Sequence, residues 1–259
     1  MNYWTRRLRA ALPWLLVGVL SSGSVMLALL PAAWITPQFA KATGGHVNLV
    51  DPAGSLWQGS ATLMLAAGSD TSASTLLPGR IEWQTAFWPL FTGRVRMTLL
   101  QSEAMPNPMT LDATRRGAIV SQGALAVPAA LLTGLGAPFN TLDLQGNVRL
   151  AWSDWRSFGN ETFGQLTVTL TDVSSRVSLV KPLGSYRVVL QAEGNRSAVD
   201  LATLKGPLML NGHGTVSAGS TMFNGTASAA PEARENLAGL LNLLGRPSGP
   251  DTVALTFVH

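Results

Sequence analysis

The sequence predicts a mainly β protein that is tethered by one N-terminal transmembrane helix. Two observations lead to this prediction. No ionisable side chain occurs between Arg9 and Lys41, and from about residue 47 onward apolar and polar residues alternate with a period of two. The first pattern is typical of a membrane span, and the second is typical of strands with one buried and one solvated face. We therefore expect antiparallel β-sheets outside the membrane.

The apolar segment at residues 12–33 is long enough to cross a bilayer. A span needs about 20 apolar residues to cover about 30 Å of hydrocarbon, and the run from Leu12 to Leu30 with its flank supplies them. Trp14 and Trp34 would then lie near opposite headgroup layers, which indole rings prefer.

The cluster Arg6, Arg7 and Arg9 gives the span a direction. Short basic flanks stay on the cytoplasmic side, so residues 1–11 are predicted to be cytoplasmic and the chain after Trp34 to lie across the membrane. A cleaved signal peptide is the alternative interpretation. The apolar run is longer than the roughly 7–15 residues of a signal core, and residues 31–33 form a poor cleavage site, so an uncleaved anchor is favoured.

The amino-acid composition excludes several classes of function. The formal net charge is +4, and the three N-terminal arginines supply most of this excess, so no dense basic surface remains for nucleic acid. The chain contains no cysteine, which excludes disulfides, thiolate metal sites and cysteine nucleophiles. This composition is compatible with a bacterial periplasm.

The alternation is clear in several segments of the exported part. In the segment at 142–152, Leu144, Val148 and Leu150 are apolar, whereas Gln145 and Arg149 between them are polar. The other segments with this pattern are residues 81–83, 95–99, 166–170, 186–190 and 253–257.

Two short helices are predicted between the strands. Pro231 begins the clearer one, which continues to Leu244 and is stopped by Gly245, and Pro128 begins the other, which continues to Leu135.

The shared Pro start and Gly stop of these helices suggest an internal duplication. Gly59 and Gly164 begin similar strand sequences 105 positions apart, and Gly79 and Gly184 have the same separation. We therefore expect a juxtamembrane linker at 34–46 and two β-rich modules at 47–152 and 153–259, each with one short helix.

The search for catalytic chemistry finds no motif in a suitable context, so no catalytic, cofactor-binding or metal-binding residue is predicted. His46, His213 and His259 have no metal-ligand spacing. Ser178 and Lys181 match a Ser-x-x-Lys motif, but residues 177–180 are interpreted as a strand, on which the two side chains would point to opposite faces. The sequence predicts a protein that is not an enzyme and that needs no cofactor.

A carbohydrate-binding platform is an alternative interpretation of the tryptophans outside the span. Trp83 and Trp152 lie on the apolar sides of their strands and are predicted to be core residues, whereas Trp155, in a polar segment at 153–159 interpreted as a loop, is predicted to be exposed. Trp57, Trp155 and the strand starts at Gly59 and Gly164 are the predicted partner-contact neighbourhoods.

Three segments carry a resemblance to a known family: Gly54-Ser-Leu-Trp-Gln-Gly-Ser-Ala, Leu77-Pro-Gly-Arg-Ile-Glu-Trp and Pro182-Leu-Gly-Ser-Tyr-Arg-Val. With one anchor and a cysteine-free, β-rich exterior, the chain resembles the type II secretion system protein N family of Gram-negative inner membranes. The resemblance implies a single-pass inner-membrane subunit without known enzymatic activity. Its partners would be other inner-membrane platform or secretin subunits of the machine that exports folded proteins.

Two hypotheses of function follow from the residues and the resemblance. The first is a non-enzymatic assembly or scaffold subunit whose sheet edges bind neighbouring subunits by strand addition. The alternative, suggested by a distant similarity to AsmA-like proteins, is a periplasmic lipid-handling module in which the apolar strand faces form a groove for lipid. A cell-wall-binding protein is a third possibility, but no acidic or tryptophan-lined cleft is evident in the sequence.

Overall fold

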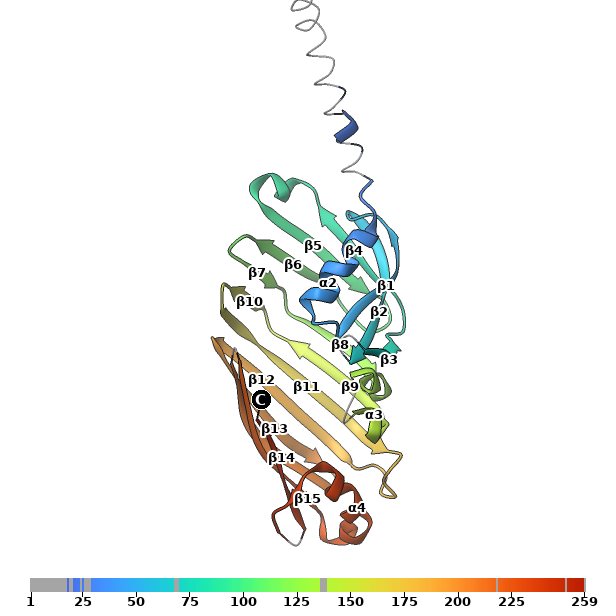
Figure 1. Cartoon of the computed structure of the whole chain (residues 1–259), viewed down its shortest axis with the longest axis vertical. Helices are drawn as coiled ribbons and strands as arrows, with labels where there is room; N and C mark the ends of the chain where they lie inside the picture. Colours follow the sequence, from blue (N-terminus) through green and yellow to red (C-terminus); the bar gives the residue numbers. More distant parts are fainter. Residues whose placement is uncertain are drawn as a thin grey trace, which may run out of the picture.

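The computed structural model of the chain describes residues 29–67, 70–135, 139–217, 219–249 and 251–258, together with residues 18, 21–23 and 25. Within these residues, seventeen strands belong to one antiparallel sheet, which is elongated and curved (Figure 1). The strands of the first half are β1 (Val47–Gly54), β2 (Gln58–Ala67), β3 (Asp70–Leu76), β4 (Ile81–Ala86), β5 (Arg94–Gln101), β6 (Met109–Thr114), β7 (Gly117–Val120), β8 (Gly123–Pro128) and β9 (Leu144–Trp152). Those of the second half are β10 (Trp155–Phe158), β11 (Glu161–Ser175), β12 (Gly184–Gly194), β13 (Arg196–Lys205), β14 (Leu208–Ser217), β15 (Ser220–Ala229), β16 (Arg246–Pro247) and β17 (Thr252–Val258).

The helical segments between the strands are short. The 3-10 turns are η1 (Ala32–Trp34), η2 (Trp88–Thr92), η3 (Ala129–Leu135) and η4 (Pro231–Ala233), and the α-helices are α2 (Thr36–Ala42), α3 (Phe139–Leu142) and α4 (Arg234–Leu244).

The strand pairings follow one continuous path along the molecule. From β1 the path runs through β2, β4, β5, β6, β7 and β10 to β11, and from β11 through β12, β13, β14 and β15 to β17. The remaining strands are side branches: β3 pairs with β2, β9 pairs with β11 and carries β8, and β16 pairs with β17.

The predicted module boundary at residues 152 and 153 lies between β9 and β10. Strands on its two sides are hydrogen-bonded to each other, because β9 pairs with β11 and β7 pairs with β10. The order of pairings is similar in the two halves: β2, β4, β5 and β6 form a meander, as do β11, β12, β13 and β14. A duplication would leave this repetition, and the duplication itself stays a prediction.

The alternation in the sequence marks one buried face. The segments predicted from period two all contain strands, and in β13 Val199 and Leu201 are half-buried while Asp200 and Ala202 are exposed. The larger core cluster continues through both halves, from Leu77 and Val148 to Tyr186 and Val253. A smaller cluster contains Ala32, Ala61 and Trp83. The predicted burial of Trp83 is confirmed, since its exposed fraction is 4%.

The helix predicted from Pro231 to Leu244 is confirmed as η4 followed by α4, which buries Leu237, Leu240 and Leu241. The other predicted helix differs in detail. Pro128 is the last residue of β8, and the helical residues after it, Ala129–Leu135, form a 3-10 turn that is followed by the separate helix α3. The predicted linker at 34–46 contains α2, which the sequence analysis did not predict.

The predicted membrane segment is described only in part. Over the residues that the structure describes, no helix has both the length and the apolar character needed to cross a membrane. Arg6, Arg7, Arg9, Trp14 and most of the segment 12–33 lie outside the described residues. Trp34 is described, and its side chain is exposed.

Candidate functional site

The predicted contact residues Gly59 and Gly164 each lie against a tryptophan ring. A Cβ atom placed on Gly59 would lie 2.5 Å from Cζ2 of Trp83, and one placed on Gly164 would lie 2.6 Å from Cε3 of Trp155. Each glycine therefore lets an indole ring approach the sheet closely. The structure gives both glycines a packing role and does not bring the two positions together.

Trp155 was predicted to be exposed in a loop, and this prediction is wrong. Trp155 begins strand β10, pairs with Val120 of β7 and is half-buried against Gly164. The polar residues around it misled the prediction: Ser153 and Asp154 precede the strand, and Arg156 lies on its exposed face.

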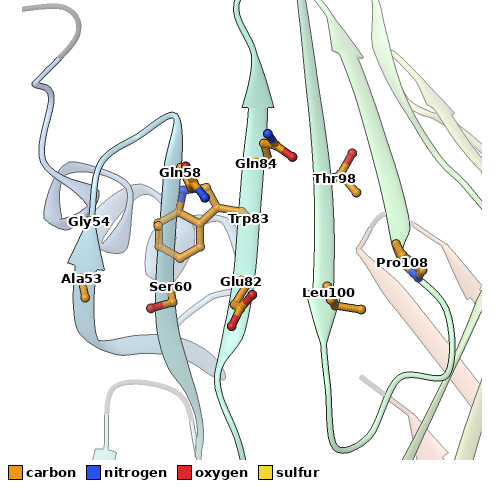
Figure 2. Close-up of a pocket in the computed structure, with 11 residues that line it drawn as sticks. Ala53, Gly54, Gln58, Ser60, Glu82, Trp83, Gln84, Thr98, Leu100 and Pro108 are labelled. Carbon is orange, nitrogen blue, oxygen red and sulfur yellow. The ribbon is translucent and has the colours of Figure 1, made fainter.

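A trough with a mixed polar and apolar lining lies across β2, β4 and β5 on one face of the sheet (Figure 2). Two rows of cross-strand neighbours form its floor, one of Ser60, Glu82 and Leu100 and one of Gln58, Gln84 and Thr98. Its volume is about 520 Å³, and Glu82 is its one ionisable lining residue. Amides, hydroxyls and a single carboxylate can form hydrogen bonds to a partner surface, but they provide no acid–base pair.

An apolar cavity of about 230 Å³ lies in the second half of the sheet, between the strands and helices α3 and α4. All its lining side chains are apolar except Tyr186, whose hydroxyl donates a 3.0 Å hydrogen bond to the carbonyl of Leu208. Burial raises the pKa of Tyr186 well above its ordinary value, so the phenol is neutral. The lining residues are Phe139, Leu142, Leu144, Leu170, Val173, Leu183, Tyr186, Leu201, Leu208, Leu210, Leu240 and Leu244.

A cluster of aromatic rings at η2 was missed by the sequence analysis. Phe87 lies edge to face against Trp57, Trp88 and Phe91, with ring centroids 5.4, 6.3 and 5.3 Å away. Trp57 is half-buried, whereas Trp88 is 80% and Phe91 72% exposed. The density of aromatic residues in Phe87-Trp-Pro-Leu-Phe91, between two predicted strands, was a signal that could have found the cluster.

The sheet edge at β1 is protected against strand addition. Asp51 and Pro52 interrupt the strand at a bulge, and helix α2 packs against β1, with the Thr43 hydroxyl donating to the carbonyl of Val47 at 2.7 Å. Charged residues, proline, bulges and covering helices are the usual means of protecting an edge.

The edge at β17 has much less protection. Among the residues that the structure describes, β17 is paired on the side away from β15 only with β16, at Val253 and Ala254. Beyond that point, residues 255–258 have no further strand beside them within the described ranges. This stretch contains neither proline nor a charged side chain.

The titratable side chains of the described residues, and the predicted Ser-x-x-Lys motif, are the candidates for a chemical site. Among the residues that the structure covers, no group of three or more His, Asp or Glu side chains could hold a metal ion. Residues 177–180 form a turn, so their interpretation as a strand was wrong. The Ser178 side chain is hydrogen-bonded to the backbone of Val180, and Lys181 is exposed. Ser178 therefore helps to shape the turn that leads into β12.

Comparison with known protein families identifies the family to which this β-rich region belongs. The family model for type II secretion system (T2SS) protein N matches residues 45–256, which include every strand from β1 to β16 and most of β17. Searches of curated proteins and of solved structures gave no match. Because the family model covers most of the sequence, the chain belongs to the type II secretion system protein N family.

Proposed function

We propose that the chain is a non-enzymatic, inner-membrane-anchored periplasmic subunit that helps to assemble or scaffold the type II secretion machine. Family membership makes the chain a component of the type II secretion system and implies contacts with other components of that system. The anchor, the orientation of the chain and its role in assembly belong to the proposal. The basic cluster Arg6, Arg7 and Arg9 and the apolar run from Leu12 to Leu30 support the anchor.

The observation that carries the scaffold role is the open outer edge of β17. Backbone N–H and C=O groups alternate in direction along a strand, and both groups of one residue point to the same neighbour. The carbonyl of Thr252 accepts from the N–H of Ser248, so the polar groups of Thr252 point away from β15. By alternation, those of Thr256 and Val258 also point outward, where an extended segment of a partner can pair with them.

Crosslinking in native membranes tests this role. A photoreactive residue at position 256 of the full-length chain is expected to crosslink to an inner-membrane platform or secretin subunit. The same probe at position 179, on the exposed turn before β12, is the control. Recovery of no secretion subunit from position 256, in a membrane extract where the assembled machine is present, would contradict the scaffold role.

The apolar cavity favours a second candidate function, lipid handling. Its lining would accept an acyl chain without an unpaired polar group, because the Tyr186 hydroxyl is already hydrogen-bonded. Its volume of about 230 Å³ argues against a whole phospholipid, since pockets for drug-sized ligands have volumes of about 300–1,000 Å³. Native mass spectrometry of the purified chain tests this candidate: a stoichiometric bound lipid supports it, and the bare protein mass contradicts it.

A further inference from the structure

Leu30 and Pro31, at the end of the apolar run, are joined directly to the turn before β2. The N–H of Leu56 donates a 2.8 Å hydrogen bond to the carbonyl of Leu30, and Pro31 forms an isolated antiparallel bridge with Ser55. Leu12 to Leu30 would extend about 28 Å as a helix at about 1.5 Å per residue, close to the thickness of the hydrocarbon layer of about 30 Å. A span over these residues therefore leaves no spacer between the bilayer and the folded body.

The turn at residues 55–57, which is hydrogen-bonded to Leu30, also contacts the aromatic cluster. The carbonyl of Trp57 accepts from the N–H of Thr85 at 2.7 Å, and the carbonyl of Leu56 accepts from the Thr85 hydroxyl at 2.9 Å. Two residues after Thr85 comes Phe87, whose ring packs on Trp57. Figure 1 shows the connection between β4 and β5 at the same end of the molecule as the segment that enters from residue 29.

The exposed side chains of this connection suit a membrane interface. Trp88 and Phe91 are large aromatic residues, and rings of this kind are favoured at the level of the headgroups. Arg94 directly follows the connection and lies opposite Thr114, which precedes Arg115 and Arg116 in the β6–β7 turn. All three arginines are exposed, and none forms an ion pair within the part of the chain that the structure describes.

We propose that the β4–β5 connection is a second membrane contact, in which Trp88 and Phe91 enter the headgroup layer and Arg94 faces anionic phospholipid headgroups. This inference rests on the membrane anchor of the proposed function. The anchor brings the folded body to the bilayer, and the bonds of Leu56 and Thr85 fix which end faces it. A phospholipid surface explains the combination of exposed rings and unpaired arginines beside the point where the span ends.

The absence of cysteine in the chain allows a direct measurement of depth. Phe91→Cys and the control Leu179→Cys would each be spin-labelled in the full-length chain and reconstituted in phosphatidylethanolamine–phosphatidylglycerol vesicles. Leu179 is also apolar and exposed, at 87%, and its turn lies toward the opposite end of the molecule (Figure 1). Neither side chain is part of the core, so both variants are expected to fold. Flotation of the vesicles with the protein reports on the anchor separately.

The label at residue 91 is expected to collide several-fold less often with a water-soluble nickel chelate, and more often with oxygen, than the label at residue 179. In vesicles without phosphatidylglycerol the label at 91 is expected to lie less deep. Equal nickel accessibility at both positions in a chain that floats would overturn the inference while leaving the anchor intact. A chain that does not float would overturn the anchor and this inference together. Protection of residue 91 only after other secretion subunits are added would assign the connection to a protein partner and also overturn it.

Discussion

The indole ring of Trp83 packs directly over the Cα of Gly59, the residue that lies opposite Trp83 in the pairing of β2 with β4. The Trp83 ring nitrogen also donates a 3.2 Å hydrogen bond to the carbonyl of Ser55. These contacts join the turn before β2 to the smaller core cluster.

The Gly59→Ala variant should therefore be destabilised. The added methyl group would lie 2.5 Å from Trp83 Cζ2 and 2.7 Å from the carbonyl oxygen of Ser55, and overpacking of this kind costs about 1–3 kcal/mol. The matched control is Gly249→Ala, where the nearest atom outside its immediate neighbours, Thr252 Cβ, is 3.8 Å away. Urea unfolding of the detergent-solubilised full-length chain measures both, and equal stabilities would contradict the packing role of Gly59.

The buried face of α4 should contribute strongly to stability. Leu237 is 0% exposed, so Leu237→Ala removes contacts on all sides and should lower the free energy of unfolding by about 2–5 kcal/mol. Leu243 belongs to the same helix and is 63% exposed, and its replacement by Ala should change the stability by about 0.5 kcal/mol or less. A similar loss in both variants would show that α4 does not cover the sheet as described.

The Tyr186→Phe variant should lose stability at neutral pH and lose part of the alkaline sensitivity of the fold. The hydrogen bond to Leu208 contributes about 0.5–1.5 kcal/mol. Burial raises the pKa of Tyr186, so in alkali the unfolded chain releases the phenolic proton at a lower pH than the folded chain does. The stabilisation is complete below the unfolded pKa of about 10 and decreases as the pH rises above it.

Unfolding free energies measured from neutral to alkaline pH check the Tyr186 prediction. The wild-type chain should lose more stability than Tyr186→Phe above pH about 10. Parallel curves for the two proteins would show that Tyr186 has the same pKa in the folded and unfolded states.

A proline in the outer edge of β17 should leave the fold intact but weaken the binding of a partner strand. Thr256→Pro removes an N–H that points away from β15, so the existing ladder is kept while an incoming strand loses a donor. We expect weaker co-purification with secretion subunits and reduced export of a secreted substrate. Thr256→Val keeps the N–H and the β-branched shape and should behave like wild type. Unchanged co-purification of a folded Thr256→Pro protein would exclude pairing at this position.

The segments predicted from period two are strands because a half-buried strand must alternate its residues, as Val148 and Arg149 do in β9. The helix at Pro231–Leu244 was also predictable, since its start, its apolar spacing and its Gly stop are all local. Local signals for α2 existed as well, because Pro37 lies in its first turn. They were overlooked because the segment was interpreted as a linker.

The candidate surfaces were less predictable because they depend on tertiary structure. Apolar residues such as Trp88 and Phe91 are usually buried, and only the position of η2 beyond the strands leaves them exposed. The open edge of β17 follows from strand order, which no local pattern specifies. Trp155 was misjudged for the same reason, since it pairs with Val120 of β7, a strand that is distant from β10 in the sequence.

The pairing of β9 with β11 and of β7 with β10 also determines how the chain can be dissected. A fragment that begins at residue 153 would contain β10 and β11 without their partners β7 and β9. A fragment that ends at residue 152 would contain β7 and β9 without β10 and β11. The unpaired backbone groups of such fragments would make them prone to aggregate or to form non-native dimers. Truncation studies of this protein therefore need point changes in the intact polypeptide as their reference.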